Sequence, residues 1–186
     1  MIWLSNSTLQ KLRDQLKKRG QRPSVVIPEP EEGGPPSQDV AEAMLALSEY
    51  GPLCEAMYLM MSADGNVTDD ERQVLRGALR NLSDDQLRSA QIEALLTTAA
   101  KNVEEHGRDE RMKEVILSLH EDKARAEVAF VLAAAIAFAD NAIADQENET
   151  LNSFAEGLGI DEATANQLLD SVEDDLAKGR EGGPAA

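Results

Sequence analysis

The stretch ADGNVTDDE at residues 63–71 occurs a second time as ADNAIADQE at residues 139–147. We call these two segments the first and the second acidic turn. Each places an aspartate and a glutamate seven positions apart: Asp64 and Glu71 in the first, Asp140 and Glu147 in the second. The second pair follows the first at a constant offset of 76 positions. Since each turn joins two predicted helices, the repeat predicts two similar helix hairpins packed into one bundle.

Helical patterns extend from the acidic turns in both directions, and no segment shows the two-residue alternation typical of a strand. We therefore expect an all-α fold, a single bundle of seven to eight helices with an internally duplicated helix–acidic turn–helix unit. Gly51 and Pro52 are expected to end one helix and begin the next, because proline fits the first turn of a helix. The expected helices are 39–50, 52–62, 68–82, 83–106, 109–120, 122–139, 144–158 and 161–179.

Charge and composition divide the chain into a helical domain (39–179) and three smaller regions. Residues 1–22 form a basic amphipathic arm with six Lys or Arg side chains and one acid. Such an arm could make weak contact with an anionic membrane, or it could pack on its own acidic domain or stay free. Residues 23–38 are rich in Pro, Glu and Gly and predict a linker. Residues 180–186 predict a disordered tail.

The net charge of −17 limits the classes of partner. It argues against nucleic acid, whose phosphates are bound by clustered Lys and Arg, and it favours cations and basic proteins. The single cysteine, Cys54, excludes an internal disulfide and is expected to be buried. The longest apolar run, 128–139, is shorter than a membrane span, and no signal peptide is recognisable. We expect a cytoplasmic protein, with the inner membrane as a surface that it could contact peripherally.

The glutamates of the two acidic turns are placed on apolar helix faces. At about 100° per residue, Glu71 lies at the centre of a stripe that continues through Leu75 and Leu82. Glu147 is centred in the same way on a stripe with Leu151 and Leu158. A carboxylate on the core-facing side of a helix requires a partner, because its burial alone is costly.

Three kinds of partner would satisfy these glutamates. The first is the helix itself, since Thr68 and Glu71 match a capping box. Ala144 stands where Thr68 stood and has no hydroxyl, so capping explains Glu147 less well. The second is an Arg or Lys of another helix, and the third is a metal ion. The residues leave cation binding and capping with ion pairs as equal alternatives.

A metal site at the acidic turns would be built from oxygen ligands. The candidate ligands are Asp64, Asn66, Glu71, Asp140 and Glu147. Carboxylate and amide oxygens suit a divalent cation such as calcium, magnesium or manganese better than zinc, which prefers Cys and His. The first turn is not an EF-hand loop, because the closing glutamate of that loop would fall at Leu75.

The sequence shows no set of residues for catalysis. His106 and His120 lie near expected helix ends, no nucleophile is paired with a base, and there is no glycine-rich phosphate loop. We expect a non-enzymatic module that binds a divalent cation and acts through contacts with a basic protein. The alternative is a metal-free acidic interaction scaffold.

At these residues the chain resembles the TerB-like tellurite-resistance family. The resemblance lies in the doubled pattern Ala-Asp-Gly-x-[Val/Ile]-x-x-x-Glu, at 62–82 and 136–160, and covers about 40–176. It implies an all-α fold, chelation of a divalent metal by the acidic turns, and a role in bacterial stress response and tellurite resistance, often near membrane-associated partners. It implies no catalytic mechanism. Asn141 replaces the second glycine, and Ala142 and Ala144 leave the second turn fewer side-chain oxygens.

Overall fold

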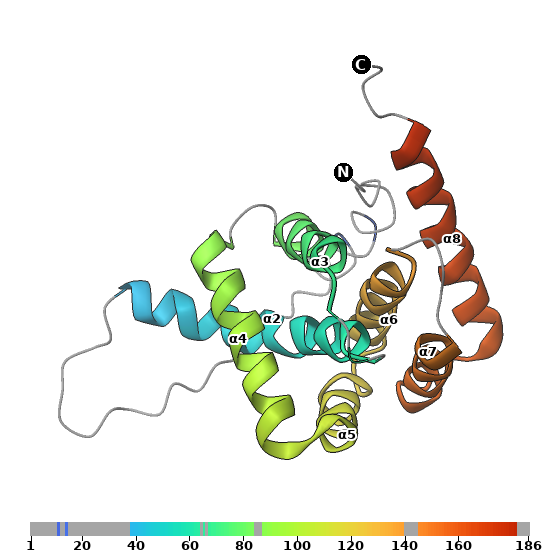
Figure 1. Ribbon diagram of the computed structural model, residues 1–186. Helices are drawn as coiled ribbons and strands as arrows, with labels where there is room; N and C mark the ends of the chain where they lie inside the picture. Colours follow the sequence, from blue (N-terminus) through green and yellow to red (C-terminus); the bar gives the residue numbers. More distant parts are fainter. Residues whose placement is uncertain are drawn as a thin grey trace.

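The computed structural model is a bundle of α-helices (Figure 1). It describes residues 11, 14, 38–63, 65, 67–83, 87–139 and 145–181. Within that range, the side chains of 38–43, 45–47, 146–147 and 179–181 are not described. The helices are α2 (Gln38–Met61), α3 (Asp69–Leu82), α4 (Ser89–His106), α5 (Arg108–Leu119), α6 (Lys123–Ala137), α7 (Asp145–Gly157) and α8 (Glu162–Glu181). With seven helices and no strand in the described residues, the expected all-α fold is confirmed.

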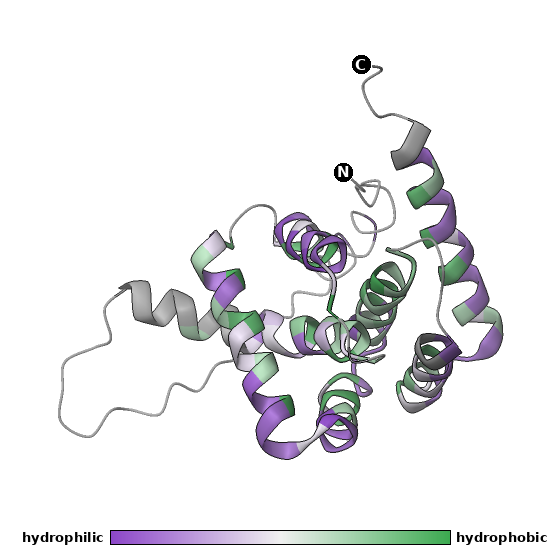
Figure 2. Cartoon of the chain, viewed as in Figure 1, coloured by the Kyte–Doolittle hydropathy of each residue, from purple (hydrophilic) through white to green (hydrophobic). Residues whose placement is uncertain are grey.

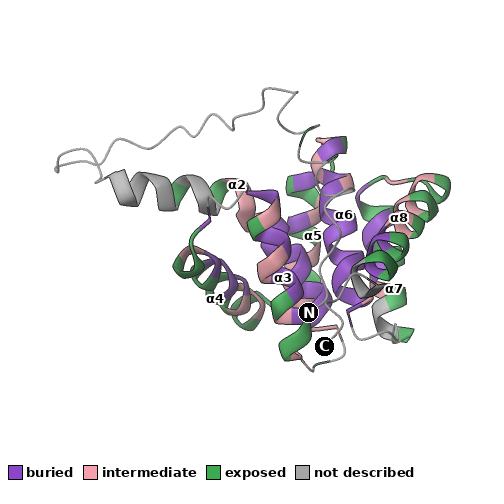
Figure 3. Cartoon of the chain, turned by 90° about the horizontal axis from the view of Figure 1, so that it is seen from above, coloured by how far each residue is buried: buried purple, intermediate pink, exposed green. Residues whose placement is uncertain are grey.

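Helix α6 forms the centre of the bundle. It packs against α2, α3, α5, α7 and α8, and all of its residues except Lys123, Arg125 and Glu127 are buried (Figure 3). Alanines fill much of its surface, so neighbouring helices approach it closely, and Figure 2 shows it as the most uniformly apolar element. The outer helices show polar faces to solvent, as amphipathic helices around a core do.

Helix α2 runs without a break through Gly51 and Pro52, so the expected boundary at these residues is wrong. An interior proline costs a helix about 3 kcal/mol through its missing amide donor and its ring. The next residues, Leu53 to Met57, are all buried, and α2 packs against α4 and α6. The apolar area buried along this helix outweighs the local penalty.

The start of α4 also differs from the expectation. The helix begins at Ser89, with Arg88 at the N-cap position, and not at Ser83. Ser83 instead closes α3, because its amide donates to the carbonyl of Leu79 at 3.0 Å and its hydroxyl accepts from the amide of Leu87 at 3.2 Å. The hydrogen bonds of this buried serine therefore go to backbone groups of α3 and of the connection, and Ser83 does not cap α4.

The helices that flank the two acidic turns occupy corresponding places in the bundle, as the repeat predicts. The first lies between α2 and α3 and the second between α6 and α7. Helices α2 and α6 pack against each other, and α3 and α7 both pack against α6. The basic arm, the linker and the tail lie outside the described residues, except that Lys11 and Asp14 are helical and exposed. None of the described helices has the length and apolarity needed to cross a bilayer.

Candidate functional site

The structure describes the five predicted ligands unequally. Asp64, Asn66 and Asp140 lie outside the described residues. Glu147 belongs to α7, but its side chain is not described. Glu71 is described in full. The structure therefore neither brings the five ligands together nor separates them, and the set stays a prediction.

The backbone of the first acidic turn is fixed on both sides of Asp64. The amide of Ser62 donates to the carbonyl of Tyr58 at 3.0 Å, and the amide of Gly65 donates to the carbonyl of Ser62 at 3.2 Å. Gly65 has φ +81°, the left-handed conformation that glycine adopts at little cost. A glycine in this conformation is typical of a turn, as the Asp-Gly pair predicts.

Glu71 is buried and turned back to the start of its own helix. Its side chain is only 3 % exposed. Its Oε2 atom accepts hydrogen bonds from the amide of Thr68 at 2.7 Å and from the Thr68 hydroxyl at 2.8 Å, while its own amide donates to that hydroxyl at 3.2 Å. The expected capping box is present. The carboxylate therefore has a local structural role, whatever else it binds.

The apolar stripes predicted around the two glutamates are confirmed. In α3 the buried residues are Glu71, Val74, Leu75, Ala78, Leu79 and Leu82. In α7 they include Leu151, Phe154, Ala155 and Leu158, whereas Asn148, Glu149, Asn152 and Glu156 are exposed. Glu71 and Glu147 each occupy the third position of their helix. The two copies of the repeat thus place their glutamates at equivalent points of equivalent helices.

Arg108, which sequence reasoning missed, connects the helices that flank both acidic turns. From the first position of α5, its Nε donates to the carbonyl of Leu59 in α2 at 3.2 Å, and its Nη2 donates to the hydroxyl of Thr150 in α7 at 3.0 Å. Burial lowers the pKa of this guanidinium. A cation at a helix N-terminus opposes the helix dipole, and this is the signal that could have singled it out.

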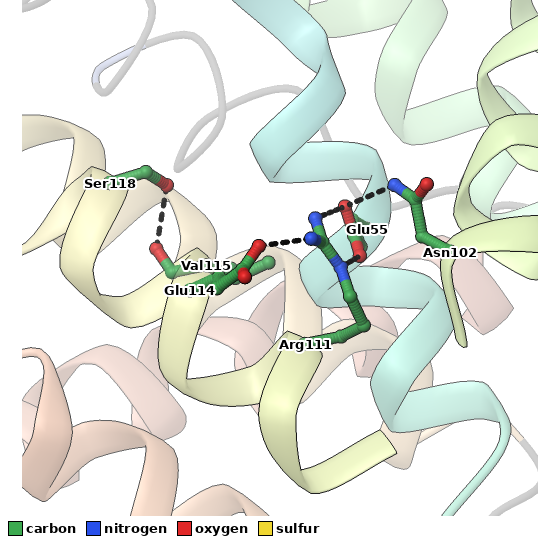
Figure 4. A network of polar contacts seen from close by, with 6 residues as sticks. All are labelled: Glu55, Asn102, Arg111, Glu114, Val115 and Ser118. Atoms are coloured by element: carbon green, nitrogen blue, oxygen red, sulfur yellow. Dashed lines mark hydrogen bonds and ion pairs between the residues drawn. The ribbon is translucent and has the colours of Figure 1, made fainter. Parts of the chain in front are cut away.

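A second, partly buried arginine holds α5 against α2 (Figure 4). Glu55 is 5 % exposed, and its carboxylate accepts hydrogen bonds from Nε of Arg111 at 2.6 Å and from Nη2 of Arg111 at 2.9 Å. Asn102 of α4 donates to the same carboxylate at 3.3 Å, and Arg111 also contacts Glu114. The hydrogen bond that Arg111 donates to the Glu55 carboxylate raises the pKa of Arg111. In the sequence, Glu55 is a lone acid in an otherwise apolar segment, and this is the signal that could have singled out the cluster.

A surface pocket of about 210 Å³ lies at the opposite end of α6 and α7 from the second acidic turn. Its polar side chains are His120, Lys123, Asp161 and Thr164. The Asp161 carboxylate is occupied as the cap of α8, since it accepts from the amide of Thr164 at 2.9 Å and from its hydroxyl at 2.8 Å. Lys123 lies 3.8 Å from Glu127. The pocket is thus lined by helix-end contacts and is separate from the acidic turns.

No group of three or more His, Cys, Asp or Glu side chains arranged to hold a metal occurs among the residues that the structure describes. That range leaves out the side chains of four predicted ligands: Asp64, Asn66, Asp140 and Glu147. Cys54 is not a candidate ligand, because it is fully buried and burial, with Glu55 and Glu93 nearby, raises its pKa to about 12.

Comparison with known proteins identifies the family. The family model described as "Tellurite resistance protein TerB" matches residues 53–170. The match begins in the second half of α2, ends in α8 and contains both acidic turns. No curated protein and no solved structure matches the chain. Because the match covers more than half of the 186 residues and includes the duplicated hairpins, the chain belongs to the TerB family of tellurite resistance proteins.

Proposed function

We propose that this TerB-family domain is a non-enzymatic module that binds a divalent cation through its two acidic turns and acts through contacts with other proteins in a bacterial stress response. One observation carries the proposal. The Asp–Glu pair recurs at the same point of two helix hairpins, and Glu71 and Glu147 are both the third residue of their helix. Capping alone does not account for the repetition, because Ala144 lacks the hydroxyl that Thr68 supplies.

The chemistry of the predicted ligands fits a hard cation. Asp64, Asn66, Glu71, Asp140 and Glu147 offer only oxygen atoms, which calcium, magnesium and manganese prefer. A bound ion would supply a double positive charge at the acidic turns. Its affinity would then depend on the carboxylates of this chain and on how firmly the flanking helices hold them.

The charge of the C-terminal helices supports a basic protein partner. Residues 145–178 contain ten acidic side chains and one basic side chain, Lys178. Many of these acids are exposed on the outer faces of α7 and α8: Asp145, Glu149, Glu156, Glu162, Asp170, Glu173 and Asp174. A partner attracted by this surface would bind faster at low ionic strength, because salt screens exposed charges.

Calorimetric titration with calcium, magnesium and manganese tests the cation proposal. We expect at least one ion to bind more tightly than about 1 mM, which is a weak affinity for a protein site. Glu71→Gln and Glu147→Gln should each weaken binding, because an amide oxygen lacks the charge of a carboxylate. Glu149→Gln is the matched control, since Glu149 lies on the exposed face of α7. Loss of affinity in the control as well would contradict the assignment of ligands.

A metal-free interaction scaffold is the second candidate function, and the capping box favours it. The bonds between Glu71 and Thr68 account for a buried carboxylate without an ion. Glu71→Gln separates the two functions, because glutamine also closes a capping box but is a poorer ligand for a cation. The scaffold predicts that neither added ion nor chelator changes the melting temperature of the wild-type protein.

A further inference from the structure

The contacts of Arg108 bear on how the two acidic turns are related. Leu59, whose carbonyl it binds, lies five positions before Asp64. Thr150, whose hydroxyl it binds, lies three positions after Glu147. One guanidinium therefore joins the last turn of α2, which precedes the first acidic turn, to the first half of α7, which follows the second acidic turn.

We propose that Arg108 is a positioning residue that couples α2 and α7, the helices before the first acidic turn and after the second, so that a displacement of one helix is transmitted to the other. The two bonds leave from different nitrogens of one rigid, planar group, so their directions are fixed relative to each other. Neither Leu59 nor Thr150 can move along its bond without moving the guanidinium or losing a contact. The consequence for cation affinity rests on the function proposed above, whereas the mechanical coupling does not.

The helix that carries Arg108 is itself held in place. One turn further along α5, Arg111 makes two hydrogen bonds to the buried carboxylate of Glu55. Residues three or four positions apart lie on the same face of a helix. Glu55 and Leu59 are four apart in α2, and Arg108 and Arg111 are three apart in α5, so both contacts join the same face of α2 to the same face of α5. Because α5 cannot easily slide on α2, a shift of α7 at Thr150 is passed to the end of α2 and is not absorbed by α5.

The effect on ion binding is tested with Arg108→Lys. Lysine keeps the positive charge, so electrostatic repulsion of the ion is preserved, but it cannot bridge the two acceptors with a fixed fork. We expect ion affinity to fall about tenfold, within the usual range of coupling between sites. Arg125→Lys is the matched control: Arg125 binds the carbonyl of Glu49 in α2 at 2.8 Å, from the end of α6 remote from the second acidic turn. Equal ion affinities in the Arg108→Lys and Arg125→Lys variants would contradict the proposed effect of Arg108 on ion binding.

Hydrogen exchange of the ion-free protein tests the coupling itself. Thr150→Val removes the hydroxyl acceptor on α7, whereas Thr150→Ser keeps it. We expect Thr150→Val, and not Thr150→Ser, to speed amide exchange at 59–63 by about fivefold, a factor that corresponds to about 1 kcal/mol for one hydrogen bond. In the Arg108→Lys background the same substitution should have no further effect there.

The outcomes of the two experiments are distinguishable. Exchange that changes only within α7, or that adds in the double variant, overturns the coupling even if the protein binds an ion. If the wild-type protein binds no ion but Thr150→Val speeds exchange at the end of α2, the cation function is wrong and the coupling by Arg108 stands.

Discussion

At the residue scale, the best-defined polar contact of the core is the ion pair between Glu55 and Arg111. Both side chains are largely withdrawn from solvent, with 7 % of Glu55 and 16 % of Arg111 exposed. Two hydrogen bonds and the contact with Asn102 satisfy the carboxylate. A buried ion pair of this kind does not by itself contribute strongly to the free energy of unfolding, because both charged groups lose their hydration on burial. Removing one partner, however, leaves the other charge buried and unpaired.

We expect Arg111→Ala to lower the free energy of unfolding by about 3 kcal/mol, because Glu55 would lose its charged partner. Lys113→Ala is the control on the same helix, since Lys113 pairs with Glu110 at the surface. That exposed pair should change stability by no more than about 0.5 kcal/mol. Urea denaturation of the two variants measures the difference. Similar decreases in the free energy of unfolding in the two variants would mean that the buried ion pair contributes no more to stability than the exposed one.

The pH dependence of the α8 cap can be tested at Asp161. The hydrogen bonds from Thr164 hold the pKa of this carboxyl below its ordinary value. A depressed folded-state pKa contributes stability above the ordinary carboxyl pKa and loses it as the pH falls through the folded value. Asp161→Ala should therefore lower the melting temperature at neutral pH, and the difference from wild type should shrink in acid. A difference that is constant with pH would exclude an ionised cap.

At the scale of the helices, two glycines that lie inside or at the end of a helix have opposite surroundings. A Cβ atom added at Gly157 in α7 would lie 2.6 Å from Cδ1 of Ile116 in α5, so this glycine permits close packing of the two helices. A Cβ atom added at Gly77 in α3 would meet no atom within 4 Å. A helix prefers alanine to glycine, so alanine should stabilise the protein at position 77, where there is room for it, and steric overlap should oppose this gain at position 157.

We expect Gly77→Ala to raise the free energy of unfolding by up to about 1 kcal/mol, the usual preference for alanine over glycine in a helix. Gly157→Ala should give no gain or a loss, because the new methyl group overlaps Ile116. Adding Ile116→Val, which removes Cδ1, should recover part of the difference. Thermal unfolding of the three variants decides the matter. A gain at Gly157 equal to that at Gly77 would show that α5 and α7 separate freely.

At the scale of the whole molecule, the repeat predicted the architecture, because a turn and its two flanking helices are local in sequence. The start of α3 was predicted from Thr68 and Glu71, since a cap acts within three residues. The continuation of α2 through Pro52 was not predictable, because burial against other helices outweighs the local preference of proline there.

The candidate site was predictable only in part, for a similar reason. The acidic ligands form a recognisable pattern in sequence, and the burial of Glu71 followed from helical periodicity. The contacts of Arg108 and Arg111 join residues 42 to 56 positions apart. A single sequence contains no signal that pairs such distant side chains, so the link between the two turns emerged only from the packing of α5 on α2 and α7.

The enclosure of α6 has a consequence for synthesis of the chain. Twelve of its fifteen residues are covered in the finished protein, partly by α7 and α8, which follow it in sequence. During translation this apolar helix leaves the ribosome before α7 and α8, so the part of its surface that they cover stays exposed until they have been made. A message truncated near codon 139 should accordingly yield inclusion bodies or a chaperone-bound fragment rather than a smaller working domain.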